Sequence, residues 1–165
     1  MTLPNTSSAF ADAVRAALAA TQADGEFSLK GPVYLIGNGG SAAIASHIAT
    51  DLLKRGSAAI LLTDPAVLSA FANDYGYKHA YAYQLHRHAT RGTLIAISSS
   101  GESENIINAA LYAANSGFHV ITLSGFSAIN PLRSKGHVNY YVPSHNYGVV
   151  EIAHLTILHS LINPG

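Results

Sequence analysis

The chain has 165 residues, and its nine Lys and Arg residues balance its nine Asp and Glu residues, so that the formal net charge is zero. The sequence contains no cluster of basic residues, so electrostatics give no support for binding to nucleic acid or to an anionic membrane surface. The absence of cysteine excludes disulfide bonds and thiolate metal sites.

Helical periodicity and short apolar runs alternate along the chain. Helices are predicted at about 8–23, where a helix for packing or oligomerisation is expected, and over 41–54, 66–71, 77–90, 104–116 and 149–162. Apolar runs bounded by turn residues predict buried strands over 32–36, 58–62, 93–97, 118–123 and 137–142. Alternating strands and helices build parallel sheets. We therefore predict an α/β fold, a three-layer sandwich with a five-stranded parallel sheet flanked by helices, in a single domain over residues 1–165.

Two polar turns follow predicted strands. The stretch 37–41 (Gly-Asn-Gly-Gly-Ser) follows the first strand, and the stretch 98–103 (Ser-Ser-Ser-Gly-Glu-Ser) follows the third. Hydroxyls and backbone N–H groups at the start of a helix suit an anion, and phosphate above all. Because ligands of parallel sheets bind at the carboxyl ends of the strands, the two turns predict one ligand site.

Two helices carry paired titratable residues. His47 and Asp51 are four residues apart and share one helix face. Such a pair can be half of a divalent-metal site, an acid/base pair, or two side chains joined by a local hydrogen bond. Glu151 and His159 are eight residues apart in an otherwise apolar helix, where burial without partners is costly. His47 and Asp51 are the obvious partners, and four such groups would make a tetrahedral site without sulfur. The pair Asn73-Asp74 is expected in a turn, either satisfying its own backbone or contacting a ligand.

These motifs, in this order over residues 32–162, resemble the SIS (sugar isomerase) domain family and its phosphoheptose isomerase branch. The stretch 37–43 followed by His47 is similar to the glycine turn and metal-binding helix of that branch. The stretch 73–77 (Asn-Asp-Tyr-Gly-Tyr) resembles its Asn-Asp-Phe-Gly-Tyr segment, and the serine turn resembles its Ser-Thr-Ser-Gly-Asn-Ser phosphate loop. The stretch 151–159 resembles its final helix, in which a Gln and a His stand eight residues apart.

The resemblance implies isomerisation of sedoheptulose 7-phosphate to D-glycero-D-manno-heptose 7-phosphate, for bacterial surface polysaccharide, by enediol proton transfer. It implies a homotetramer with zinc-containing active sites at subunit interfaces, and Asp51 and His159 as the catalytic residues. The implied zinc ligands are His47, Asp51, Glu151 and His159. The implied substrate and phosphate contacts are Asn38, Gly39, Gly40, Ser41, Asn73, Asp74, Ser98, Ser99, Ser100, Ser103 and Glu151.

The chain departs from the family pattern at two of these positions. Asp51 stands where the family has Glu, which sets the carboxylate back by about 1.5 Å, one C–C bond. A displacement of ~1 Å can cost about a hundredfold in rate. Glu151 stands where the family has Gln, and one hypothesis is a coupled exchange that preserves the metal site.

A second hypothesis is a non-catalytic phosphosugar- or protein-binding module, resembling the family branch that binds the bacterial replication initiator. That branch lacks the carboxylate on the metal-binding helix, so Asp51 and His159 favour an enzyme.

Composition adds expectations about assembly and location. Charged residues make up only 11% of a chain that is 48% hydrophobic, which indicates a surface covered by other subunits. Residues 1–8 are polar and lack the pattern of a signal peptide, and no apolar stretch approaches the ~20 residues of a membrane span. We therefore expect a cytoplasmic oligomer with a phosphosugar partner and with neither nucleic acid nor membrane.

Overall fold

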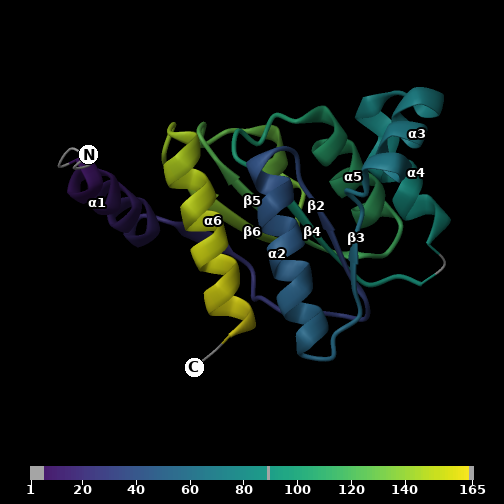
Figure 1. Cartoon of the computed structure of the whole chain (residues 1–165), viewed down its shortest axis with the longest axis horizontal. Coiled ribbons are helices and arrows are strands. Elements are labelled where there is room, and N and C mark those ends of the chain that lie inside the picture. The colour runs from purple at the N-terminus through teal and green to yellow at the C-terminus, as the bar shows by residue number, and fades with distance from the viewer. Residues whose placement is uncertain (1–5, 89, 164–165) are drawn as a thin grey trace, which may run out of the picture.

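The structure is a computed structural model, and it describes residues 6–88 and 90–163, so the ends of the predicted domain lie outside the described residues. Figure 1 shows three layers, with one sheet between two layers of helices. Six strands lie in the order β1-β6-β5-β4-β2-β3. Their bounds are β1 (Gln22–Asp24), β2 (Val33–Ile36), β3 (Ala59–Leu61), β4 (Thr93–Ser98), β5 (His119–Gly125) and β6 (Val138–Val142). The predicted α/β sandwich is confirmed.

The sheet is mixed, because its five parallel strands carry a sixth, antiparallel strand. Strands β2 to β6 pair in parallel and correspond to the five predicted strands. Strand β1 pairs antiparallel with β6, so the prediction of an all-parallel, five-stranded sheet is wrong at this edge. All three residues of β1 are exposed and none is strongly apolar, so no hydrophobic pattern marks the strand in the sequence.

The helices are divided between the two faces of the sheet. Their bounds are α1 (Thr6–Ala19), α2 (Gly40–Lys54), α3 (Pro65–Tyr75), α4 (Ala80–Arg87), α5 (Glu104–Asn115) and α6 (Tyr147–Ile162), with short 3-10 helices η1 (Tyr77–His79) and η2 (Pro131–Ser134). Helices α1, α2 and α6 bury their apolar residues against one face. Helices α4 and α5 do so against the other. Figure 1 shows α2 and α6 side by side on the same face of the sheet.

The central strands are buried on both faces, as parallel strands covered by helices must be. Along β2, for example, Leu35 packs towards α2 and α6. Its neighbour Ile36 packs towards α4 and α5. Among the described residues, no helix combines the length and the apolar character that crossing a membrane requires.

Helix bounds differ from the prediction by more than two residues in three places. The first helix ends at Ala19 rather than 23, because the following residues pair with β6 as β1. The third helix begins at Pro65, after an Asp64 side chain that accepts a hydrogen bond from the Val67 N–H (3.0 Å), and runs to Tyr75. The predicted helix 77–90 is divided into η1 and α4, which ends at Arg87. Residues 73–74 therefore lie in the last turn of α3, and the prediction of a turn there is wrong.

Candidate functional site

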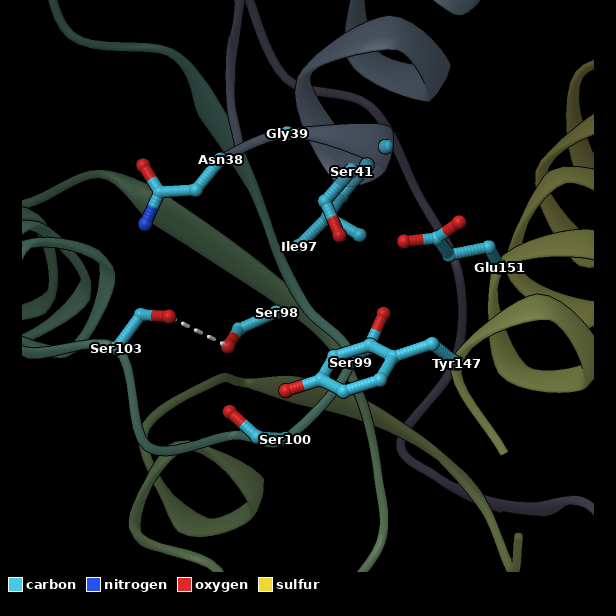
Figure 2. A pocket seen from close by; sticks show the side chains of 11 residues that line it. Asn38, Gly39, Ser41, Ile97, Ser98, Ser99, Ser100, Ser103, Tyr147 and Glu151 are labelled. Carbon is cyan, nitrogen blue, oxygen red and sulfur yellow. Dashed lines mark hydrogen bonds between the residues drawn. The ribbon is translucent and has the colours of Figure 1, made fainter. Parts of the chain in front are cut away.

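A pocket of about 260 Å³ lies where β2 and β4 end and α2 and α5 begin. Figure 2 shows side chains from both turns and from α6 converging on it. The lining residues are Asn38, Gly39, Gly40, Ser41, Ile97, Ser98, Ser99, Ser100, Ser103, Tyr147 and Glu151. The two polar turns predicted to form one site are thus adjacent, because β2 and β4 are neighbours in the sheet.

The serine turn presents hydroxyls at the start of α5. Ser98 donates a hydrogen bond to the Ser103 hydroxyl (3.2 Å), and the Glu102 N–H donates to the Ser100 hydroxyl (3.2 Å). The Ser99 hydroxyl is buried and has no hydrogen-bond partner among the described residues. A buried hydroxyl without a partner is uncommon in folded proteins. An anion at the start of α5 would supply the missing partner and would meet the positive end of the helix dipole.

The glycine turn makes room for a carboxylate. Gly39 has a φ of +53°, in the left-handed region that favours glycine, and directly precedes α2. A Cβ atom on Gly40 would overlap the carboxylate of Glu151, which reaches across from α6. Figure 2 shows Glu151 pointing towards Ser41 and the start of α2. Among the described residues no side chain caps α2, so the negative charge of Glu151 lies where the helix dipole favours it.

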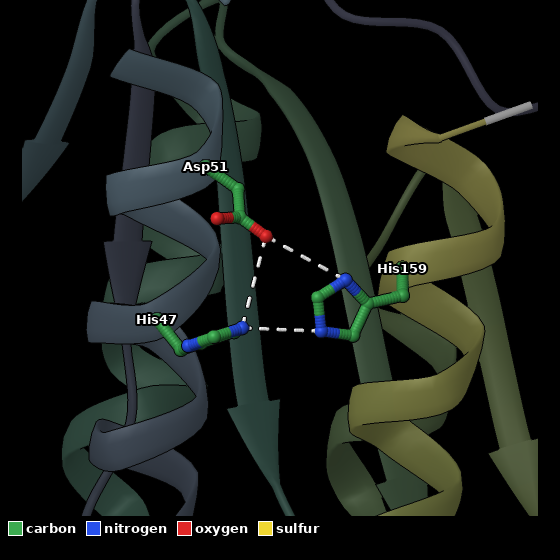
Figure 3. A group of neighbouring side chains, drawn as sticks. All are labelled: His47, Asp51 and His159. Atoms are coloured by element: carbon green, nitrogen blue, oxygen red, sulfur yellow. Dashed lines mark hydrogen bonds and ion pairs between the residues drawn. The ribbon is translucent and has the colours of Figure 1, made fainter. Parts of the chain in front are cut away.

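A second group lies further along α2 and α6, where His47, Asp51 and His159 face one another (Figure 3). The Nε2 atoms of the two histidines are 3.2 Å apart. Asp51 Oδ2 lies 3.7 Å from His47 Nε2 and 3.6 Å from His159 Nδ1. All three side chains are partly exposed. Two imidazoles and a carboxylate make a donor set typical of zinc.

The spacing of the two histidine nitrogens also fits a metal. Two nitrogen ligands of a tetrahedral zinc ion, each ~2.0–2.1 Å from the metal, lie about 3.4 Å from each other. The separation of 3.2 Å between the histidine Nε2 atoms is close to that value. Asp51 Oδ2 faces the other ring nitrogen of His159, Nδ1 (3.6 Å), so the three residues could hold one zinc ion after a small shift of Asp51 or of the His159 ring.

The structure does not bring Glu151 into this group. Three of the four predicted metal ligands have donor atoms within 4.8 Å of one another, and Glu151 is not among them. Glu151 precedes His159 by eight residues of α6, about 12 Å along the helix axis, and lines the pocket instead. None of His47, Asp51 and His159 lines the pocket. Within one chain, the pocket and the candidate metal group are neighbouring but separate.

Asn73 and Asp74 also lie away from the pocket lining. Their side chains are bonded to each other, from Asn73 Nδ2 to Asp74 Oδ1 (3.1 Å), at the exposed end of α3. Neither residue contacts the pocket within a single chain.

Three residues near the pocket were not predicted. Tyr147, which is 58% exposed, extends across the mouth of the pocket in Figure 2. It stands four residues before Glu151 and shares its helix face, a spacing that could have revealed it. Asn105 and Tyr77 are hydrogen-bonded to Asn38 at the pocket rim, and no local pattern indicates those contacts.

The chain belongs to the SIS domain family, whose family profile matches residues 2–125. The phosphoheptose isomerase of Roseiflexus sp. is 38% identical over 141 residues, which span 81% of this chain and 71% of the relative. That of Helicobacter pylori is 34% identical, over 80% of this chain and 72% of the relative. These relatives identify the phosphoheptose isomerase branch as the one to which the chain belongs.

Solved structures agree with this assignment. A phosphoheptose isomerase from Neisseria gonorrhoeae superimposes with a TM-score of 0.74 at 33% identity, over 81% of this chain and 76% of that one. One from Francisella tularensis has a TM-score of 0.72 at 29% identity, over 96% of this chain and 85% of that one.

Proposed function

We propose that the protein is a phosphosugar aldose–ketose isomerase that converts sedoheptulose 7-phosphate to D-glycero-D-manno-heptose 7-phosphate. The observation that carries the proposal is the serine-lined pocket at the start of α5, with its unpartnered buried Ser99 hydroxyl. Relatives named phosphoheptose isomerases support the substrate. We place the activity in the cytoplasm, where its product would supply heptose for lipopolysaccharide.

The phosphate of the substrate is proposed to bind in the serine turn. The hydroxyls of Ser98, Ser99, Ser100 and Ser103 and the first backbone N–H groups of α5 would surround its oxygens. Of these hydroxyls, that of Ser99 would benefit most from a hydrogen bond to the phosphate, because it has no other partner among the described residues. The sugar would then extend from the serine turn towards the glycine turn and Glu151.

Isomerisation moves one proton between C1 and C2 and a second proton between the two oxygens, through a cis-enediol. We propose Asp51 and His159 for these transfers, with Glu151 as a substrate contact within the pocket. His47, Asp51 and His159 would hold a zinc ion. The predicted fourth ligand, Glu151, lies about 12 Å away along α6 and stays with the pocket, so it is not part of the proposed zinc site. When bound, zinc polarises carbonyl and hydroxyl oxygens.

Because the two groups are separate in one chain, we propose that the complete site forms at a subunit interface of a homotetramer. The exposed apolar residues of α1 and α6 support an interface on this side of the molecule. Phe10 (43% exposed) and Ile152 (45% exposed) are examples.

The experiment is NMR of the purified protein with sedoheptulose 7-phosphate, with and without a chelator. We expect conversion to the heptose 7-phosphate, and its loss in the chelated protein. Asp51→Asn and His159→Asn should each abolish turnover. No conversion by the zinc-loaded protein would reject the proposed function, and binding of the phosphosugar without turnover would instead indicate the non-catalytic binding module.

A further inference from the structure

The two turns of the pocket are joined by a reciprocal pair of amide hydrogen bonds. Asn38, in the glycine turn, donates from Nδ2 to Asn105 Oδ1 (2.9 Å). Asn105, in the first turn of α5, donates from Nδ2 back to Asn38 Oδ1 (2.9 Å). The two residues are 67 positions apart in the sequence, and Asn105 is only 3% exposed. This pair, which we call the amide clasp, connects the turn after β2 to the helix that follows the serine turn.

Two tyrosines from the helical layer that contains α4 and α5 also bind the glycine turn. Tyr77 donates from its hydroxyl to Asn38 Oδ1 (2.8 Å). Tyr81, buried on α4, donates to the backbone carbonyl of Gly37 (2.8 Å). The glycine turn is therefore held by side chains from η1, α4 and α5.

The hydrogen-bonding capacity of the clasp is almost fully used. A carboxamide oxygen has two lone pairs. Asn38 Oδ1 accepts from Asn105 and Tyr77, and Asn105 Oδ1 accepts from Asn38 and from the Ile106 N–H (3.0 Å). Neither oxygen has a lone pair left for a ligand. The side chain of Asn38, predicted as a substrate contact, keeps only its second Nδ2 hydrogen for that purpose.

We propose that Asn105 is a positioning residue, acting through Asn38 and assisted by Tyr77, that sets the separation of the serine turn from the glycine turn. The inference rests on the proposed function, because the proposed substrate would contact the serine turn with its phosphate and the glycine turn with its sugar at the same time. A misplacement of ~1 Å between two parts of a site can cost about a hundredfold in rate. Inorganic phosphate, by contrast, needs only the serine turn, and its binding does not depend on the separation.

The test compares Asn38→Ala, Asn105→Ala and the double variant with wild type. Two quantities are measured: the turnover of sedoheptulose 7-phosphate, and the inhibition constant of inorganic phosphate. We expect kcat to fall about a hundredfold in each single variant. We expect the phosphate inhibition constant to stay within about twofold, and the double variant to be no slower than the slower single variant, because both changes open one clasp.

A milder variant and two controls guard against effects on folding. Tyr77→Phe leaves the clasp in place but removes the hydrogen bond that supports it at Asn38 Oδ1, and should lower kcat by a smaller factor. The matched control Tyr83→Phe removes the hydroxyl of an exposed tyrosine of α4 whose ring stacks on Tyr75. Tyr112→Phe removes a hydrogen bond between the same helix α5 and His86 Nδ1 near the end of α4 (3.1 Å), which involves neither Tyr77 nor a residue of the clasp. Both controls should retain wild-type kcat.

The outcomes separate the inference from the function on which it rests. If wild type turns over the substrate and Asn105→Ala keeps its kcat, the inference is wrong and the function stands. Multiplicative losses in the double variant, or a matching rise in the phosphate inhibition constant, would also overturn it. A wild-type protein without turnover rejects the function, and the inference falls with it.

Discussion

Acid should destabilise the protein through one buried histidine. His154, on α6, is completely buried, and its Nε2 atom donates to the Ser124 backbone carbonyl (3.1 Å). Its Nδ1 atom has no partner among the described residues. Burial lowers the pKa of His154 from 6.5 to about 4, although the hydrogen bond to Ser124 opposes the change.

The sign of the effect follows from proton linkage. Because the folded-state pKa lies below the unfolded-state value, the unfolded chain binds more protons between about pH 6.5 and 4. The stability that His154 contributes is therefore complete above pH 6.5 and is lost as the pH falls through this window. With these pKa values, linkage predicts a loss of about 2 kcal/mol in the free energy of unfolding between pH 8 and pH 5.

The assay is urea unfolding of wild type and His154→Leu at pH 8 and pH 5. Wild type should lose about 2 kcal/mol more than the variant, since leucine does not titrate. Burial also lowers the pKa of His119, but that residue is present in both proteins and cancels in the difference. His145→Leu, at an exposed position, should behave as wild type. Equal pH dependence in wild type and His154→Leu would refute the reasoning.

Three further predictions concern the pocket and the metal group. Ser99→Ala removes a buried hydroxyl without a partner, so the stability measured by thermal unfolding should stay level or rise. The KM for the phosphosugar should rise about tenfold or more. An unchanged KM would exclude Ser99 from phosphate binding. Gly40→Ala should fold normally, because the overlapping Glu151 carboxylate is the end of a flexible side chain, but the displaced carboxylate should lower kcat/KM at least about tenfold. Wild-type kcat/KM in Gly40→Ala would contradict that role. Zinc at about a hundred times its Kd should stabilise the protein by about 2.7 kcal/mol in chemical unfolding. His47→Ala should abolish the shift, and a variant that keeps it would place the ion elsewhere.

Local sequence patterns were sufficient for most of the framework. The five parallel strands are short apolar runs bounded by turn residues, and each was predicted from a few neighbouring residues. The pairing of His47 with Asp51 follows from a spacing of four residues in one helix. The serine turn is likewise a local feature, and its place at the start of α5 follows from the strand and helix around it.

The strand β1 shows where local patterns carry no information. Its three exposed residues pair with β6, which lies more than a hundred positions later in the chain. An edge strand with no buried face has no hydrophobic alternation, and its partner is chosen by the folded sheet.

The position of Glu151 was likewise decided only by tertiary structure. The sequence identifies Glu151 and His159 as two costly residues in one apolar helix, but eight residues separate them by about 12 Å along its axis. Packing of α6 against α2 brings His159 to His47, and it brings Glu151 to Gly40. The amide clasp of Asn38 and Asn105 has the same origin, since β2 and β4 become neighbours only in the sheet.

The sequence determined the elements and the chemistry of each motif, because these depend on residues within a few turns of one another. The folded structure decided which motifs meet, because that depends on strand order and helix packing across the whole chain.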